Sequence, residues 1–185
     1  MSLAFILTAL ALTTGFIEPA QRERSQAGLF VVKSTFSEYW RHANLVIECR
    51  VGGSRTRLIG QGNSPPGLTE WDVEVIKVFK QTSRDPVAGR LWVASSTESY
   101  GTADRTWKVR DVQPPVLYEG DHVIVFLQEW PAAKVPVIMS GAAGVYEVDG
   151  PRVHVPALVR GLSPFNGRAS LSLDEFVKLL GRQPK

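Results

Sequence analysis

The chain has 185 residues, of which 44% are hydrophobic and 21% charged; this is an ordinary globular composition, and it excludes global disorder. A domain of this length buries roughly two-thirds of its unfolded surface and needs no covalent cross-link to fold. The single cysteine, Cys49, excludes an intrachain disulfide, and we interpret it as a small buried hydrophobe. The net charge of +3 comes from scattered basic residues, so charge alone does not indicate a nucleic-acid-binding surface.

The N-terminus carries an apolar stretch, Leu3–Ile17, that is shorter than the ~20 residues needed to span a bilayer but typical of a signal peptide. Ser25 and Ala27 place small residues where a signal peptidase would cleave before Gly28, and an earlier site at residues 13–15 is the alternative. The first two residues lack the basic charge of an ordinary signal peptide. We expect residues 1–27 to be a signal peptide and residues 28–185 to be a single domain. The alternative is a cytoplasmic protein in which the apolar stretch is a buried helix.

The first elements of the mature chain are a helix and a strand. Ser34–Ala43 has a Thr-x-x-Glu capping box and aromatic residues at helical spacing, which predicts a helix that closes one end of a sheet. Asn44–Gly52 then predicts a strand ended by Gly52 and Gly53. The following Arg55–Gly67 is rich in glycine and contains two prolines, so we expect it to be a loop.

The central element is a long strand, Thr69–Lys80, in which apolar and acidic residues alternate up to Val75. Beyond Val75 the alternation breaks, because Ile76, Val78 and Phe79 cannot all lie on one face. A β-bulge or a sharp coil of the strand near Ile76 and Lys77 explains the break, and such a device bends a strand where a sheet curves.

The rest of the chain alternates short apolar segments with turns and ends in a helix. The apolar run Val123–Leu127 predicts a strand covered on both faces, and Ser172 with Glu175 forms a capping box that predicts a helix over 172–181. We expect Gly141–Gly144 to allow a close backbone approach, and a hairpin with Asp149 and Gly150 in its turn. Further strands are predicted at Arg90–Ser95, Thr106–Val112, Val137–Met139 and Val145–Val148.

This order of elements predicts an all-β fold: a small, closed barrel of five to six strands with a short helix at each end. The predicted strands do not alternate with helices, so the sequence does not indicate a parallel sheet.

Several motifs resemble those of bacterial exported proteins with a netrin-like or TIMP-like OB domain. They are A-x-L-V at Ala43–Val46, W-x-V-x-V-x-x-V-F-K at Trp71–Lys80, a Gly with Phe-Leu over Gly120–Leu127, G-x-x-G-x-Y-x-V at Gly141–Val148 and S-L-x-E-F at Ser172–Phe176. The resemblance covers roughly residues 34–180 and implies the OB-like barrel. TIMP domains inhibit metalloproteinases through an N-terminal cysteine that this chain lacks, so the resemblance transfers no site residues.

The residues that carry chemistry are scattered. His42, His122 and His154 lie in different elements without metal-ligand spacing, and the nucleophile-elbow and phosphate-loop motifs do not occur. We therefore expect no metal, no cofactor and no enzymatic activity. The alternative is an enzyme whose site assembles in space around His122 or His154.

Aromatic residues next to basic ones provide the candidate binding residues, Trp92, Tyr100, Trp107 and Arg105, accompanied by Arg90, Lys108 and Arg110. Such a surface stacks bases in OB-type binders of single-stranded nucleic acid, which is the alternative function.

We expect the chain to be a monomeric, non-catalytic module outside the cytoplasm, with no membrane span in the mature chain. It would bind an unknown protein or envelope component through its 53–68 and 96–106 loops.

Overall fold

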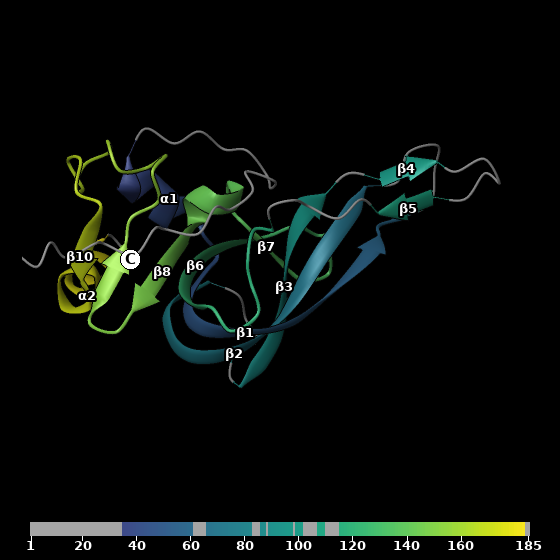
Figure 1. Cartoon of the computed structure of the whole chain (residues 1–185), viewed down its shortest axis with the longest axis horizontal. Coiled ribbons are helices and arrows are strands. Elements are labelled where there is room, and N and C mark those ends of the chain that lie inside the picture. Colours follow the sequence, from purple (N-terminus) through teal and green to yellow (C-terminus); the bar gives the residue numbers. More distant parts are fainter. Residues whose placement is uncertain are drawn as a thin grey trace, which may run out of the picture.

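The computed structural model describes residues 35–60, 66–82, 86–87, 89–97, 99–101, 107–109 and 115–183. This part of the chain is mostly β-structure, with two α-helices (Figure 1). One sheet has the strand order β1-β2-β3-β7-β6-β8-β9-β10, and β1 also pairs with β6. β4 and β5 pair with each other in a separate sheet. The strands are β1 (Leu45–Leu58), β2 (Gly67–Gln81), β3 (Arg90–Thr97), β4 (Ser99–Gly101), β5 (Trp107–Val109), β6 (His122–Glu129), β7 (Pro136–Ile138), β8 (Val145–Asp149), β9 (Arg152–His154) and β10 (Ser170–Ser172).

Both helices begin at the capping boxes that the sequence predicts. In α1 (Phe36–His42) the Thr35 hydroxyl accepts a hydrogen bond from the Glu38 backbone N–H, and the Glu38 carboxylate accepts one from the Thr35 N–H. In α2 (Leu173–Gly181) Ser172 and Glu175 make the same reciprocal pair. The two boxes satisfy backbone donors that the first helical turn leaves free. The predicted helices are therefore confirmed.

β2 is the long bent strand that the sequence predicts. In its pairing with β1, Glu48 lies opposite Lys77 and Cys49 opposite Val75, so Ile76 is an extra residue. The predicted bulge is confirmed, and Phe79 is skipped in the same way three residues later. These irregularities increase the local twist, and β1 and β2 curve strongly together (Figure 1).

The end predicted for the first strand is wrong. β1 does not stop at Gly52 and Gly53 but continues to Leu58, because the two glycines form a bulge opposite Asp72. The expected 53–68 loop is thereby reduced, within the described residues, to the few positions between Leu58 and Gly67. The expected 96–106 loop is also partly strand, since β3 runs to Thr97 and β4 follows it.

β6 separates two hydrophobic cores. Ile124 and Phe126 point into an aromatic cluster, whereas Val123, Val125 and Leu127 point into a second, mainly aliphatic core. This arrangement confirms the prediction that both faces of the strand are covered.

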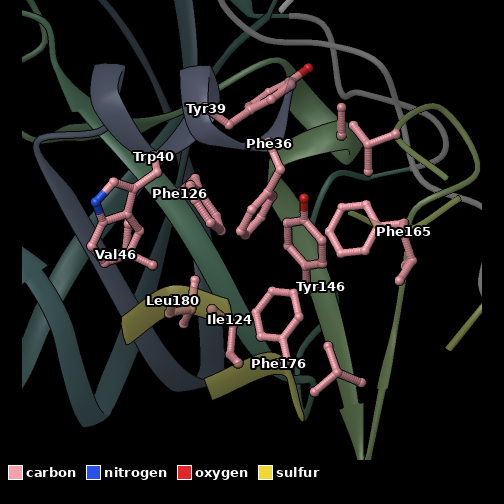
Figure 2. Packing of buried hydrophobic residues seen from close by; sticks show 14 of the residues in the cluster. Phe36, Tyr39, Trp40, Val46, Ile124, Phe126, Tyr146, Phe165, Phe176 and Leu180 are labelled. Carbon is pink, nitrogen blue, oxygen red and sulfur yellow. The ribbon is translucent and has the colours of Figure 1, made fainter. Parts of the chain in front are cut away.

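The aromatic cluster lies between the two helices and β6, β8 and β9 (Figure 2). Its central ring is Tyr146, and the rings around it are 4.9–6.2 Å away, centroid to centroid. These rings are Phe36, Phe126, Phe165 and Phe176. The cluster occupies the end of the molecule opposite to β4 and β5 (Figure 1).

A third, small cluster lies on the outer side of β2 and β3. Leu68 and Ala94 pack there against Ala133 and Val137, and Trp130 is partly buried beside them. The turn that joins β6 to β7 therefore covers this end of the sheet. The side chain of Arg57, in β1, donates a hydrogen bond to the carbonyl of Ala133 in this turn.

Two predictions about turns have different outcomes. The hairpin of β8 and β9 forms, but Asp149 pairs with Arg152, so the turn residues are Gly150 and Pro151 rather than Asp149 and Gly150. Gly150 has a φ of 53°, which glycine adopts without steric cost. The close approach predicted for Gly141–Gly144 is confirmed, because a Cβ on Gly144 would collide with the carbonyl of Met139.

Candidate binding surface

The most concentrated group of charged and aromatic side chains in the described chain lies on the outer face of β1, β2 and β3. β2 alternates, so Trp71 and Val73 point into the aliphatic core while Glu70 and Asp72 point to the opposite face. The strand register brings Arg55 of β1 opposite Glu70 and Trp92 of β3 opposite Asp72. We call Arg55, Arg57, Glu70, Arg90 and Trp92 the arginine–tryptophan face.

Glu70 is the centre of this face. Its side chain has 0% of its surface exposed, and its Oε2 accepts a hydrogen bond from Arg55 Nε at 2.8 Å. Its Oε1 accepts a second one from Arg57 Nε at 2.5 Å. Arg57 also donates through Nη2 to the carbonyl of Ala133, in the turn that covers the third cluster. One buried carboxylate thus orients two arginines, because a buried charge is stable only when it is paired and hydrogen-bonded.

Arg55 lies flat over an aromatic ring. Its guanidinium carbon is 3.9 Å from the centroid of Trp92, well within the range of a cation–π interaction. The side chain of Arg55 is nevertheless 54% exposed. Within the described part of the chain, Arg55 hydrogen-bonds through Nε, so its terminal Nη edge remains for a ligand.

A second arginine contact lies beside the first. Arg90 donates from Nε at 3.2 Å and from Nη2 to the Asp72 carboxylate, and these hydrogen bonds, together with the carboxylate charge, raise the pKa of Arg90. Arg90 is 66% exposed. It extends toward Gly52, where a side chain would meet its Nη2 and the Asp72 carbonyl. The glycine bulge of β1 therefore makes room for this ion pair.

The face as a whole has a mixed charge pattern. The central strand β2 contributes the acidic residues Glu70, Asp72 and Glu74, and the flanking strands contribute arginines. Glu74 lies opposite Arg50 on one side and Arg90 on the other. Opposite charges on adjacent strands stabilise the sheet, so part of this pattern is structural. The side chains of Arg55 and Arg90 are exposed and can therefore bind a partner.

The structure describes the backbone of three of the four binding residues that the sequence suggests, Trp92, Tyr100 and Trp107. Trp92 lies on the arginine–tryptophan face. Tyr100 lies opposite Lys108, and Gly101 opposite Trp107, in the β4–β5 pair, which is not part of the sheet that contains Trp92. Arg105 lies outside the described residues. The structure therefore does not show a common surface of these four residues.

Sequence reasoning missed Arg55, Arg57 and Glu70. Arg55 and Arg57 alternate with Thr56 and Leu58, which is the period of a strand, but the two preceding glycines suggested that the strand had ended. In the sequence, Glu70 is only one of the acidic residues that alternate with apolar ones in Thr69–Lys80. In the structure it is fully buried, and Arg57, which binds its carboxylate, also binds the carbonyl of Ala133, a residue distant in sequence.

The histidines and the cysteine lie apart. His122 Nε2 is 2.9 Å from the carboxylate of Glu48, whereas Cys49, the next residue of β1, points into the aliphatic core on the other face. Burial raises the pKa of Cys49 to about 12, and the charges of Glu48 and Asp121 add to this effect. The thiol is therefore protonated at neutral pH. Among the described residues, no three His, Cys, Asp or Glu side chains gather in a metal-binding arrangement.

Comparisons with known proteins add no functional assignment: neither the scan against protein-family models nor the search of curated proteins found a match. In the part of the chain that the structure describes, neither helix has the length and apolar character to cross a membrane.

Proposed function

We propose that this chain is a non-catalytic, exported module that binds a protein or envelope component outside the cytoplasm through the arginine–tryptophan face. The observation that carries the proposal is the contact of the Arg55 guanidinium with the ring of Trp92: a buried carboxylate holds this arginine, and more than half of its side-chain surface is still exposed. Arginine and tryptophan are the residues most often found at the energetic centres of protein interfaces. An oriented, exposed guanidinium is suited to carboxylates or other anions.

The proposal also includes the fold that carries the arginine–tryptophan face. We infer that β1, β2, β3, β7 and β6 form a small OB-like barrel, as the resemblance to netrin-like and TIMP-like domains implies. The strand pairings support this inference, because they run from β1 to β2, β3, β7 and β6 and then return to β1. In OB folds, ligands bind on the face of the second and third strands and on the loops beside it. The arginine–tryptophan face occupies the corresponding strands.

Single-stranded nucleic acid is the second candidate ligand, favoured by the same position on the fold and by the Trp92 ring. The mixed charge of the face argues against it. A phosphate backbone that crosses β2 would meet the partly exposed Asp72 and the exposed Glu74, and both would repel it. A protein surface, which carries charges of both signs, has no such conflict.

The proposal is tested by capturing partners from envelope extract on immobilised wild-type protein and on the double variant Arg55→Ala, Trp92→Ala. A variant with Leu158→Ser is the matched control, because Leu158 is exposed but belongs to a different part of the chain. A partner that is captured must then bind as a purified protein to the wild type and to the control, and at least tenfold more weakly to the double variant. Equal binding by all three proteins would remove the face from the proposal.

Two further measurements test the other parts of the proposal. Cell fractionation with intact-mass analysis should find a product that begins near Gly28 outside the cytoplasm, whereas a full-length cytoplasmic product would contradict export. Labelled oligothymidylate should show no tight, salt-sensitive binding. If it binds and if Trp92→Ala abolishes the binding, nucleic acid is the ligand.

A further inference from the structure

We infer that Glu70 is a positioning residue that turns Arg55 into an oriented receptor for a carboxylate of an acidic partner protein. This inference rests on the proposed function and adds the chemistry of the ligand and the residue that selects it. The starting observation is that the face holds a fully buried negative charge, Glu70, at the point where it presents the positive charge of Arg55. On net charge alone, such a carboxylate would weaken the binding of any anion.

The geometry explains why the carboxylate favours binding. An arginine side chain has several rotatable bonds, and immobilising it on binding costs about 0.5–1.5 kcal/mol. In this face Arg55 is already fixed twice, by the 2.8 Å hydrogen bond from Nε to Glu70 and by the ring of Trp92 at 3.9 Å. Fixation at Nε leaves the two Nη groups as a planar fork, which matches the two oxygens of a carboxylate.

Glu70 is itself held in place by its other contacts. Arg57 binds its second oxygen and also binds the carbonyl of Ala133. Ala133 packs with Leu68, Ala94 and Val137 in the third hydrophobic cluster. The orientation of the exposed Arg55 therefore depends on a chain of contacts that reaches a packed turn between β6 and β7.

The face favours a protein carboxylate over a nucleic-acid phosphate. Asp72 and Glu74 follow Glu70 on the same face of β2, and Glu74 is exposed. A polyanionic backbone would have to pass these charges, whereas an acidic side chain needs to reach only the Nη edge of Arg55. Binding of a phosphate polymer is accordingly an outcome that the test must be able to detect.

The test measures binding of a fluorescein-labelled oligoglutamate peptide to the full mature chain by fluorescence anisotropy, with oligoglutamine and oligothymidylate of equal length for comparison. We expect the wild type to bind oligoglutamate, to ignore oligoglutamine and to prefer oligoglutamate to oligothymidylate. Arg55→Ala should weaken the binding roughly tenfold.

Two substitutions that change the net charge equally separate orientation from charge. Glu70→Gln and Glu74→Gln each remove one negative charge from β2. Glu70→Gln should weaken oligoglutamate binding about three- to tenfold, because one of the two oxygens that accept from Arg55 and Arg57 becomes an NH2 group, which cannot accept, and the orientation of Arg55 is weakened. Glu74→Gln should leave binding unchanged or strengthen it slightly, because Glu74 is exposed and its substitution removes a repulsive charge. Stronger binding by Glu70→Gln would overturn the inference.

A third substitution decides the question even if Glu70→Gln does not fold. Arg55→Lys keeps the charge at an exposed position but loses both Nε and the planar fork. We expect it to bind almost as weakly as Arg55→Ala, and wild-type affinity would show that a point charge is sufficient. No binding of oligoglutamate to the wild type would overturn the carboxylate receptor, while the partner capture separately decides the proposed function. Preference for oligothymidylate would replace the protein partner with nucleic acid.

Discussion

At the scale of single residues, Tyr146 has a ring at the centre of the aromatic cluster and a buried hydroxyl group. Its ring is surrounded by four phenylalanines (Figure 2), and its buried hydroxyl has no hydrogen-bond partner among the described residues. Burial also raises the pKa of this hydroxyl well above its ordinary value. A buried hydroxyl that lacks a partner loses its hydration without compensation, so it lowers the stability of the fold.

Tyr146→Phe should therefore raise the free energy of unfolding by about 1 kcal/mol, as measured by urea denaturation. Tyr39→Phe is the control, because the hydroxyl of Tyr39 points away from the cluster (Figure 2), and its removal should change little. A loss of stability in Tyr146→Phe would show that the hydroxyl binds an internal water molecule.

The raised pKa of Cys49 predicts that the free energy of unfolding depends on pH. Its pKa is about 12 in the folded chain and near 9.0 when it is solvated, so the folded state keeps the thiol proton that the unfolded state releases. The contribution of Cys49 to stability is complete below pH 9 and is lost as the pH rises from about 9 to 12. The loss is at most about 1.4 kcal/mol per pH unit.

The measurement compares unfolding free energies of the wild type and Cys49→Ala across this range, because other groups also titrate there. The difference between the two proteins should shrink as the pH rises. A constant difference would mean that the thiol is already accessible to solvent in the folded state.

At the scale of elements, Gly144 fixes how the 3₁₀ helix Gly141–Gly144 meets β7 and β8. A side chain at Gly144 would press against the carbonyl of Met139, which is backbone and cannot rotate away. Gly144→Ala should lower the unfolding free energy by about 2 kcal/mol or more, detected by thermal denaturation. Gly53→Ala is the matched control, because nothing lies within 4 Å of its Cβ position. Equal effects would contradict the close approach.

The elements also show what a sequence can predict. Thr35 with Glu38 and Ser172 with Glu175 are local patterns, and both helices follow from them. The bulge at Ile76 was equally readable, because alternation fails at the residue where the register shifts. Gly52 and Gly53 misled the prediction, because a glycine pair marks a strand end and a bulge alike. Only the pairing that resumes at Ser54 opposite Trp71 distinguishes the two, and that partner is 17 residues away.

The candidate site was less predictable than the fold for the same reason. Trp92 could be named from its residue type, but its contact with Arg55 joins two different strands. Arg57, which binds the buried Glu70, is in turn held by a third segment, the turn around Ala133. Composition and local sequence patterns carry no information about such contacts between residues that are far apart in the sequence.

At the scale of the whole molecule, β6 joins the aromatic cluster to the aliphatic core. Phe126 faces the cluster, Val125 faces the core, and neither core is complete without this strand. The two cores should therefore unfold together. Phe126→Leu and Val125→Ala should each lower the unfolding free energy by about 1–3 kcal/mol while leaving a single transition. Tryptophan fluorescence and far-ultraviolet circular dichroism should follow the same curve, and separate midpoints would reveal two independently folding units.

The double coverage of β6 has a consequence for how freely the sequence can vary. In an exhaustive library of single substitutions, the β2 positions from Glu70 to Glu74 should alternate between intolerant and permissive, with the buried Glu70 as the exception. The run Val123–Leu127 should show no alternation, since every side chain in it is buried. That stretch should accept only apolar residues of similar volume, at every position. The strand that unites the two cores would then also be the segment with the least freedom to drift.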